Sequence, residues 1–79
     1  MSPRPRPARP HERVWSVRKD GKPTDCTLVG QGEDGWECRF LYNGDLAYSR
    51  RWVMRADALA EAEAKRRELD AVGWKQVTG

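Results

Sequence analysis

Short segments in which apolar and polar residues alternate are separated, at near-even spacing, by turns that contain glycine. These turns are Asp20-Gly21, Glu33-Asp34-Gly35 and Asn43-Gly44. Alternation with a period of two predicts half-buried strands, and Asp-Gly and Asn-Gly are typical of two-residue hairpin turns. A segment rich in Ala, Glu and Arg, without Gly or Pro, then runs from Asp45 to Val72. The order predicts an α+β fold, a four-stranded antiparallel meander with one C-terminal helix packed on one face.

The first two turns predict one apolar face shared by three strands, at residues 13–19, 24–31 and 36–42. A tight turn at Asp20-Gly21 and a three-residue loop at Glu33-Asp34-Gly35 fix the pairing. The pairs expected are Lys19 with Lys22, Trp15 with Cys26, Arg13 with Leu28, Leu28 with Phe40, Cys26 with Tyr42, and Gly30 with Cys38. The core face then carries Trp15, Val17, Cys26, Leu28, Trp36, Cys38, Phe40 and Tyr42.

The fourth strand, at residues 45–53, has two possible registers. A tight turn at Asn43-Gly44 places Ala47, Ser49 and Arg51 on the core face, and Leu46, Tyr48, Arg50 and Trp52 on the outer face. A three-residue loop ending at Asp45 reverses this, because a slip of one residue exchanges the faces of a strand. Turn chemistry favours the first register and hydrophobic patterning favours the second. We favour the tight turn, because small Ala47 and Ser49 leave room for a helix to approach.

The segment from Arg55 to Val72 is predicted to be the helix. Its apolar residues recur at a spacing of three to four, which is typical of one helix face packed on a core. They are Ala58, Leu59, Ala62, Leu69 and Val72. Gly73 is suited to the residue after the helix end, and Trp74 is expected to pack back on the last turn.

The N-terminal segment differs from the rest in composition. Residues 1–11 hold four of the five prolines and three arginines, so we expect a disordered or polyproline-II arm, followed by a single domain at residues 12–79. The net charge of +3 comes from residues 1–13, whereas residues 14–79 hold 11 basic and 11 acidic residues. A cationic arm attached to a neutral body is therefore expected.

No pattern in the chain points to catalysis or to a metal or cofactor. Cys26 and Cys38, on neighbouring strands and offset by one pair, are expected to be buried apolar residues with reduced thiols. His11 is the only histidine and lies in the arm. No nucleophile has a base implied by a motif, so we expect no enzyme, no cofactor and no metal. No apolar run is long enough for a membrane span, and we expect a cytoplasmic protein whose composition is typical of bacteria.

The best functional hypothesis is a small nucleic-acid-binding accessory protein, with DNA or RNA as partner. Arginines interleaved with aromatic residues on an outer sheet face are typical of sheet readers, and a basic arm adds attraction to phosphate. A second cationic group lies at the corner between the last strand and the helix. The candidate residues are Arg4, Arg6, Arg9, Arg18, Arg39, Tyr48, Arg50, Arg51, Trp52 and Arg55. The alternative is a protein-interaction or homodimerisation module, with Trp52 as the exposed tryptophan.

The order of strands followed by a helix is similar to that of sheet-type DNA readers, the arm-binding domains of phage integrases and the plant AP2 domains. The likeness lies in element order and in a sheet that bears arginine and tryptophan. No residue of either family is carried over to this chain, so the likeness adds little to the functional hypothesis.

Overall fold

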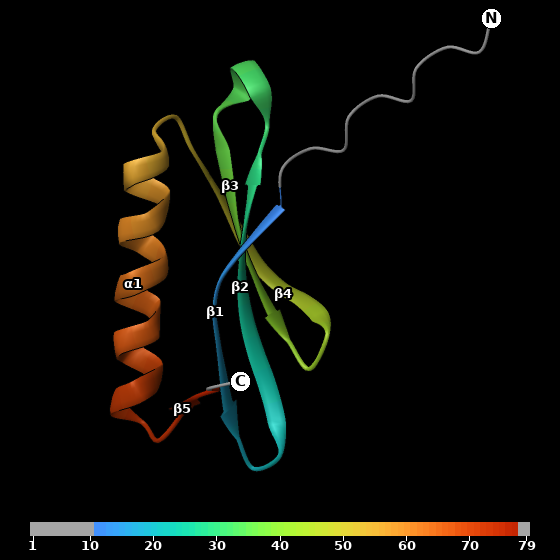
Figure 1. The fold of residues 1–79 in the computed structure, drawn as a ribbon, viewed down its shortest axis with the longest axis vertical. Coiled ribbons are helices and arrows are strands. Elements are labelled where there is room, and N and C mark those ends of the chain that lie inside the picture. Colours follow the sequence, from blue (N-terminus) through green and yellow to red (C-terminus); the bar gives the residue numbers. More distant parts are fainter. Residues whose placement is uncertain (1–10, 78–79) are drawn as a thin grey trace, which may run out of the picture.

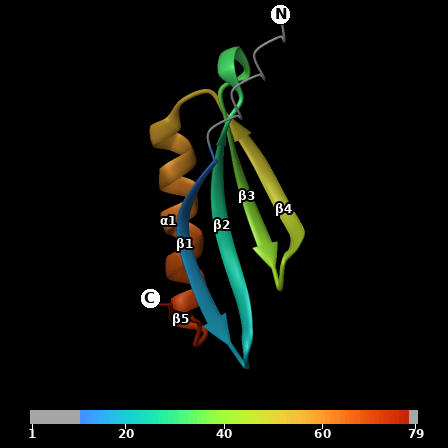
Figure 2. The ribbon, with the colours of Figure 1, turned by 45° about the vertical axis from the view of Figure 1, so that its right-hand side comes forward.

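The computed structural model describes residues 11–77, which form one antiparallel sheet and one helix (Figure 1). The strand order across the sheet is β4-β3-β2-β1-β5. The helix α1 lies along one face of the strongly twisted sheet, and the other face is left uncovered by any helix or strand in this part of the chain (Figures 1 and 2). The elements are β1 His11–Lys19, β2 Lys22–Gly30, the 3₁₀ turn η1 Gly32–Asp34, β3 Trp36–Tyr42, β4 Asp45–Trp52, α1 Arg55–Ala71 and β5 Lys75–Gln76.

The predicted α+β class, with an antiparallel sheet and one C-terminal helix, is confirmed. The strand count is not, since a fifth short strand follows the helix. Gly73 adopts a φ of 101°, and the Trp74 N–H donates to the carbonyl of Leu69, so the chain turns back at the helix end as predicted. Lys75 and Gln76 then pair with Arg18 and Val17 of β1. At the other end, His11 belongs to β1 rather than to the arm.

The β1–β2 hairpin has the predicted tight turn, with positive φ at Asp20 and Gly21. Lys19 pairs with Lys22 and Trp15 with Cys26, as expected. Further along, a bulge between Arg13 and Trp15 adds one residue to β1, so Arg13 pairs with Thr27 and the predicted partner Leu28 is wrong. The bulge moves Arg13 to the face opposite Trp15.

The connection between β2 and β3 is longer than predicted. Five residues, 31–35, form it around a 3₁₀ turn, and Gly30 pairs with Trp36. Every β2–β3 pair is therefore shifted by two residues from the predicted register, so Cys26 pairs with Phe40 and Leu28 with Cys38. A shift of two preserves the faces, which is why the predicted core residues of these strands are nevertheless on one side.

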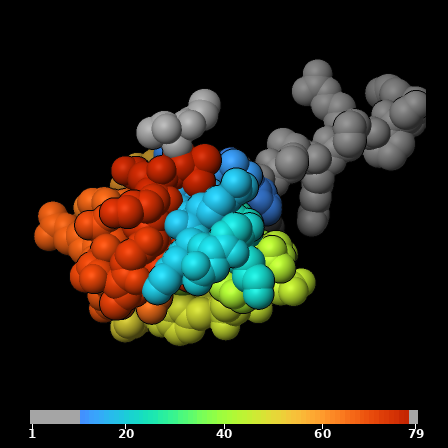
Figure 3. Space-filling view, turned by 90° about the horizontal axis from the view of Figure 1, so that it is seen from below, coloured from blue at the N-terminus to red at the C-terminus, as the bar shows by residue number. Residues whose placement is uncertain are grey.

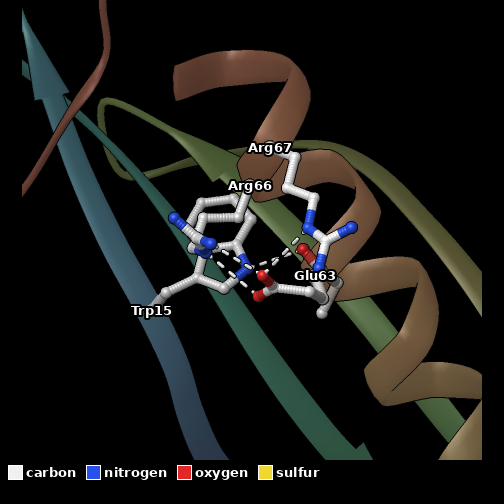
Figure 4. A network of polar contacts seen from close by, with 5 residues as sticks. Trp15, Glu63, Arg66 and Arg67 are labelled. Carbon is white, nitrogen blue, oxygen red and sulfur yellow. Dashed lines mark hydrogen bonds and ion pairs between the residues drawn. The ribbon is translucent and has the colours of Figure 1, made fainter. Parts of the chain in front are cut away.

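The helix packs closely because it presents alanine to the sheet. Ala58 and Ala62 are fully buried, and Ala62 packs in one core cluster with Trp15, Val17 and Phe40. The indole N–H of Trp15 donates to the Ala62 carbonyl at 2.8 Å, beside the ion pairs that Glu63 makes with Arg66 and Arg67 (Figure 4). Because the buried indole of Trp15 is hydrogen-bonded to the helix backbone, it fixes the position of α1 on the sheet.

Two further contacts complete the covered side. The end of α1 lies against the β1–β2 hairpin (Figure 3), where the Lys19 ammonium donates to the Val72 carbonyl at 2.7 Å. Cys26 and Cys38 are both buried thiols, and their sulfur atoms are 3.5 Å apart. The hydrogen bond between them, and then burial, raise the pKa of the Cys26 thiol. The expectation that both are buried small residues is confirmed.

Candidate nucleic-acid interface

The fourth strand decides which predicted residues share a face. Its turn is the tight one, since Asn43 and Gly44 have positive φ and Tyr42 pairs with Asp45. A bulge follows at once: Leu41 pairs with Leu46 but Phe40 pairs with Tyr48, so Ala47 is an extra residue. From Tyr48 onward the strand has exchanged faces.

The predicted placement of Tyr48, Arg50 and Trp52 on the outer face is therefore wrong. These residues stand in register with Phe40, Cys38 and Trp36 on the side that α1 covers. The bulge reconciles the two registers left open by the sequence, because the tight turn is kept and the large rings still reach the helix side. Leu46, before the bulge, remains on the outer face as predicted.

Tyr48 and Arg50 both contact the helix through Glu61. The ring of Tyr48 stacks on Phe40 with centroids 5.6 Å apart, and its hydroxyl donates to Glu61 at 3.4 Å. The Arg50 guanidinium lies 3.4 Å from the Glu61 carboxylate and 4.3 Å from the centre of the Trp52 ring. Arg50 therefore has a carboxylate to balance its charge and an aromatic face to pack on. Trp52, predicted to be the exposed tryptophan, is half-buried, and its indole N–H has no acceptor among the described residues.

Arg55, predicted to form a cationic corner, is also paired. As the first residue of α1, it lies 2.6 Å from the Glu12 carboxylate and 5.7 Å from the centre of the Trp36 ring. Glu12 is in register with Leu28 on the covered side of the sheet. The pair thus joins the start of the helix to β1.

The opposite side of the sheet, which we call the open face, has a different composition. Strand pairing arranges it in transverse rows, of which the central one crosses four strands from Arg13 through Thr27 and Arg39 to Ser49. The other rows are His11, Val29, Glu37 and Arg51; Ser16, Asp25, Leu41 and Leu46; and Arg18 with Pro23, to which Lys75 of β5 adds. Figure 2 shows the strands that carry these rows, with α1 on their other side.

Arg39, at the centre of the open face, is held by a network of neighbours. Its Nε donates to the Glu37 carboxylate at 2.7 Å, and the Gln31 amide donates to the same oxygen at 3.0 Å. Burial alone would raise the pKa of Glu37, but hydrogen bonding and charge from Arg39, with hydrogen bonds from Ser49 and Gln31, lower it overall. Glu37 thus remains ionised and holds the guanidinium in one orientation.

The remaining arginines of the open face differ from Arg39 in having no carboxylate partner in the described part of the chain. Within residues 11–77, Arg13, Arg18 and Arg51 form no ion pair and no side-chain hydrogen bond, and all three are exposed. The open face carries four arginines and Lys75 against Asp25 and Glu37, whereas residues 11–77 as a whole hold equal numbers of basic and acidic side chains. A neutral domain therefore has one cationic side.

The structure thus divides the predicted site. Arg18, Arg39 and Arg51 are together on the open face, Tyr48, Arg50 and Trp52 lie on the covered side, and Arg55 lies at the helix start. Arg4, Arg6 and Arg9 fall outside the described residues. Arg51 was expected on the core face, and Arg13 was not among the candidates. Both errors come from bulges, for which the sequence gives no strong signal.

Beside the covered side, a groove runs between β4 and α1. It has a volume of about 290 Å³ and is lined by Phe40, Tyr48, Glu61, Ala64, Lys65 and Glu68. Acidic and basic side chains face each other here, with Lys65 and Glu68 3.5 Å apart. Within the described residues, no group of three or more His, Cys, Asp or Glu side chains is placed to hold a metal ion. The one helix in this part of the chain is not long and apolar enough to cross a membrane.

Comparison of the chain with protein-family models, with curated proteins and with solved structures finds no match. The geometry of the open face is therefore the basis of the functional argument.

Proposed function

We propose that this protein binds nucleic acid through the open face of its sheet. The observation that carries the proposal is a set of three exposed arginines, Arg13, Arg18 and Arg51, that have no acidic partner among residues 11–77 and surround an Arg39 held by Glu37. A face of four strands that no helix covers gives these groups a broad surface on which to meet a polyanion.

The energetic reason is the release of counterions. Each phosphate neutralised by an arginine frees a condensed cation, so the affinity falls steeply as salt rises. Thr27, in the same row as Arg39, adds a hydroxyl group that donates to phosphate or contacts base edges. The predicted contribution of Arg4, Arg6 and Arg9 would add to the same electrostatic attraction.

The test is a titration of the full chain against labelled mixed-sequence oligonucleotides over a series of salt concentrations. Binding at low salt that weakens linearly in the logarithm of salt concentration supports the proposal. A variant with Arg13, Arg18 and Arg51 changed to Ala should then lose most of the affinity, while a variant with Arg4, Arg6 and Arg9 changed to Ala should lose part of it. No binding at 20 mM salt would contradict the proposal.

A second candidate function, self-association, is favoured by the outer edge of β4. This eight-residue strand ends the sheet, and it displays unpaired backbone groups beside exposed apolar side chains. Leu46, Tyr48, Val53 and Met54 are 58, 47, 83 and 60 % exposed. Pairing of two β4 edges would produce a dimer that salt does not dissociate, which sedimentation velocity at low and high salt measures. A monomer at both salt concentrations would exclude it.

A further inference from the structure

We infer that the partner of the open face is double-stranded DNA, and that Arg39 is the residue that contacts base edges. This inference rests on the proposed function and makes it specific. It is carried by the separation of aromatic from cationic side chains between the two sides of the sheet.

Every Trp, Tyr and Phe side chain of the strands is on the covered side. Register places Trp15, Trp36, Phe40, Tyr42, Tyr48 and Trp52 there. The seventh such residue, Trp74, follows the helix and packs edge-on against Tyr42, with ring centres 6.2 Å apart. Among the described residues of the open face, the only aromatic ring is the imidazole of His11, in a corner row at the beginning of β1.

Recognition of single strands depends mainly on Trp, Tyr and Phe rings, and the described residues of this face include none of these. Proteins that bind single-stranded DNA or RNA stack unpaired bases on aromatic side chains, at about 1–3 kcal/mol per base. A duplex keeps its bases stacked on one another and instead presents phosphates and groove edges, for which arginine, threonine and serine are suited. Imidazole rings and guanidinium planes also stack on unpaired bases, but without a Trp, Tyr or Phe the described residues of the open face fit a duplex better than a single strand.

Groove dimensions favour DNA over RNA. The major groove of B-form DNA is about 12 Å wide and admits a two-stranded ribbon, whereas the major groove of an RNA duplex is too narrow for side chains to read. Neighbouring strands are about 4.8 Å apart, so the central row spans roughly 14 Å from β1 to β4. The inner strands β2 and β3 then fit the groove, with Thr27 and Arg39 toward its floor. Arg13 and Arg51, on the outer strands, lie over the flanking phosphates.

Arg39 is the base reader in this arrangement because its orientation is fixed. With Nε donating to Glu37 at 2.7 Å, the two terminal nitrogens of the guanidinium have no partner among the described residues. Together they form the two-donor fork that pairs with O6 and N7 of guanine. Arg13, Arg18 and Arg51 have no such carboxylate among the described residues, as expected for phosphate contacts that do not discriminate between sequences.

The first experiment compares a 20-base-pair DNA duplex, each of its separated strands, and an RNA duplex of the same sequence, with the full chain and at one salt concentration. We expect the DNA duplex to bind at least tenfold more tightly than the others. Equal or tighter binding to a single strand or to the RNA duplex would overturn this inference and leave the proposed function standing. Failure of all four probes to bind at low salt would overturn both.

The second experiment selects preferred sites from a pool of random DNA duplexes. The wild-type chain should enrich a site containing a guanine, and Arg39→Lys should reduce the preference for that base about tenfold or more, because an ammonium lacks the fork. Arg51→Ala should weaken binding to all sequences alike and reduce the salt slope by about one. Urea unfolding confirms that each variant is folded. Unchanged selectivity in folded Arg39→Lys would overturn the assignment of Arg39.

Discussion

The two sides of one sheet carry different chemistry although they share every strand. On the covered side, aromatic rings and thiols pack against an alanine-rich stripe of α1. Arg50 of β4 and Arg55 of α1, on this side, each have a carboxylate partner. On the open face, Arg13, Arg18 and Arg51 have none within residues 11–77. Stability is thus assigned mainly to the covered side and binding to the open face, so a substitution should change the property of its own side more than that of the other.

The largest expected difference in the free energy of unfolding is between alanine substitutions at two successive residues of β3. Phe40 is 3 % exposed between the rings of Trp15 and Tyr48, whereas Leu41 is half-buried on the open face. Phe40→Ala should lower the free energy of unfolding by about 3–5 kcal/mol, because it leaves a cavity. Leu41→Ala should cost about 1 kcal/mol. Urea unfolding measures both, and similar losses would refute the assignment of the two faces.

Gly35 tests where the end of β4 lies. Its φ is 87°, and a Cβ there would overlap the carbonyl oxygen of Trp52. Gly35→Ala should cost about 1–3 kcal/mol for a backbone conformation, with ψ at −134°, that is essentially confined to glycine, and about 1–3 kcal/mol more for the overlap. Gly32→Ala is the control, since Gly32 has a φ of 61° and open space around it, and should cost only about 1–2 kcal/mol for its left-handed backbone. Equal losses in denaturant titrations would mean that Trp52 is not beside this turn.

The alanine stripe of α1 is expected to be intolerant of larger side chains. Ala62 is fully buried beside Trp15, and Ala60 on the same helix is exposed. Ala62→Leu should cost about 1–3 kcal/mol by overpacking, whereas Ala60→Leu should change stability by less than about 0.5 kcal/mol. Thermal unfolding of the pair provides the comparison. A neutral Ala62→Leu would show that the helix does not approach the sheet this closely.

The smallest effect expected is the pH dependence from Glu37. The folded pKa of Glu37 is lowered, so its contribution is present above its unfolded value of about 4.3 and is lost as the pH falls through the folded pKa. Glu37→Gln should therefore destabilise by about 1 kcal/mol near pH 7, since Arg39 is partly exposed, and by less near pH 3. Urea unfolding of both proteins at the two pH values measures this. If the stability difference between the wild type and Glu37→Gln were larger at pH 3 than at pH 7, the pKa of Glu37 would not be lowered by folding.

Local sequence signals predicted much of this fold. The Asp20-Gly21 and Asn43-Gly44 signals correctly predicted two hairpin turns and helped to predict three strands with a shared core face. The apolar spacing of α1 correctly predicted the helix. The bulge at Ala47 was missed, because an extra residue in a strand has no composition of its own. One such residue was enough to move Tyr48, Arg50 and Trp52 to the covered side.

The candidate site was predicted only in part for the same reason. Arg18 and Arg39 lie on regular stretches of β1 and β3, and alternation placed them correctly on the open face. Arg13 and Arg51 lie beyond bulges, where counting along the strand gives the wrong side. Ion pairs such as that between Arg50 and Glu61 join positions far apart in the chain, so no local pattern could distinguish paired from free arginines.

Arg50 and Arg51 provide the most direct test of the account. They are neighbours in β4 with the same side chain, but Arg50 pairs with Glu61 on the covered side, whereas Arg51, on the open face, has no ion-pair partner within residues 11–77. The measurement is the affinity of Arg50→Ala and Arg51→Ala for a DNA duplex over a salt series. We expect Arg51→Ala to weaken binding and to reduce the salt slope by about one, and Arg50→Ala to bind as the wild type does. Weaker binding by Arg50→Ala with no change in Arg51→Ala would contradict the account.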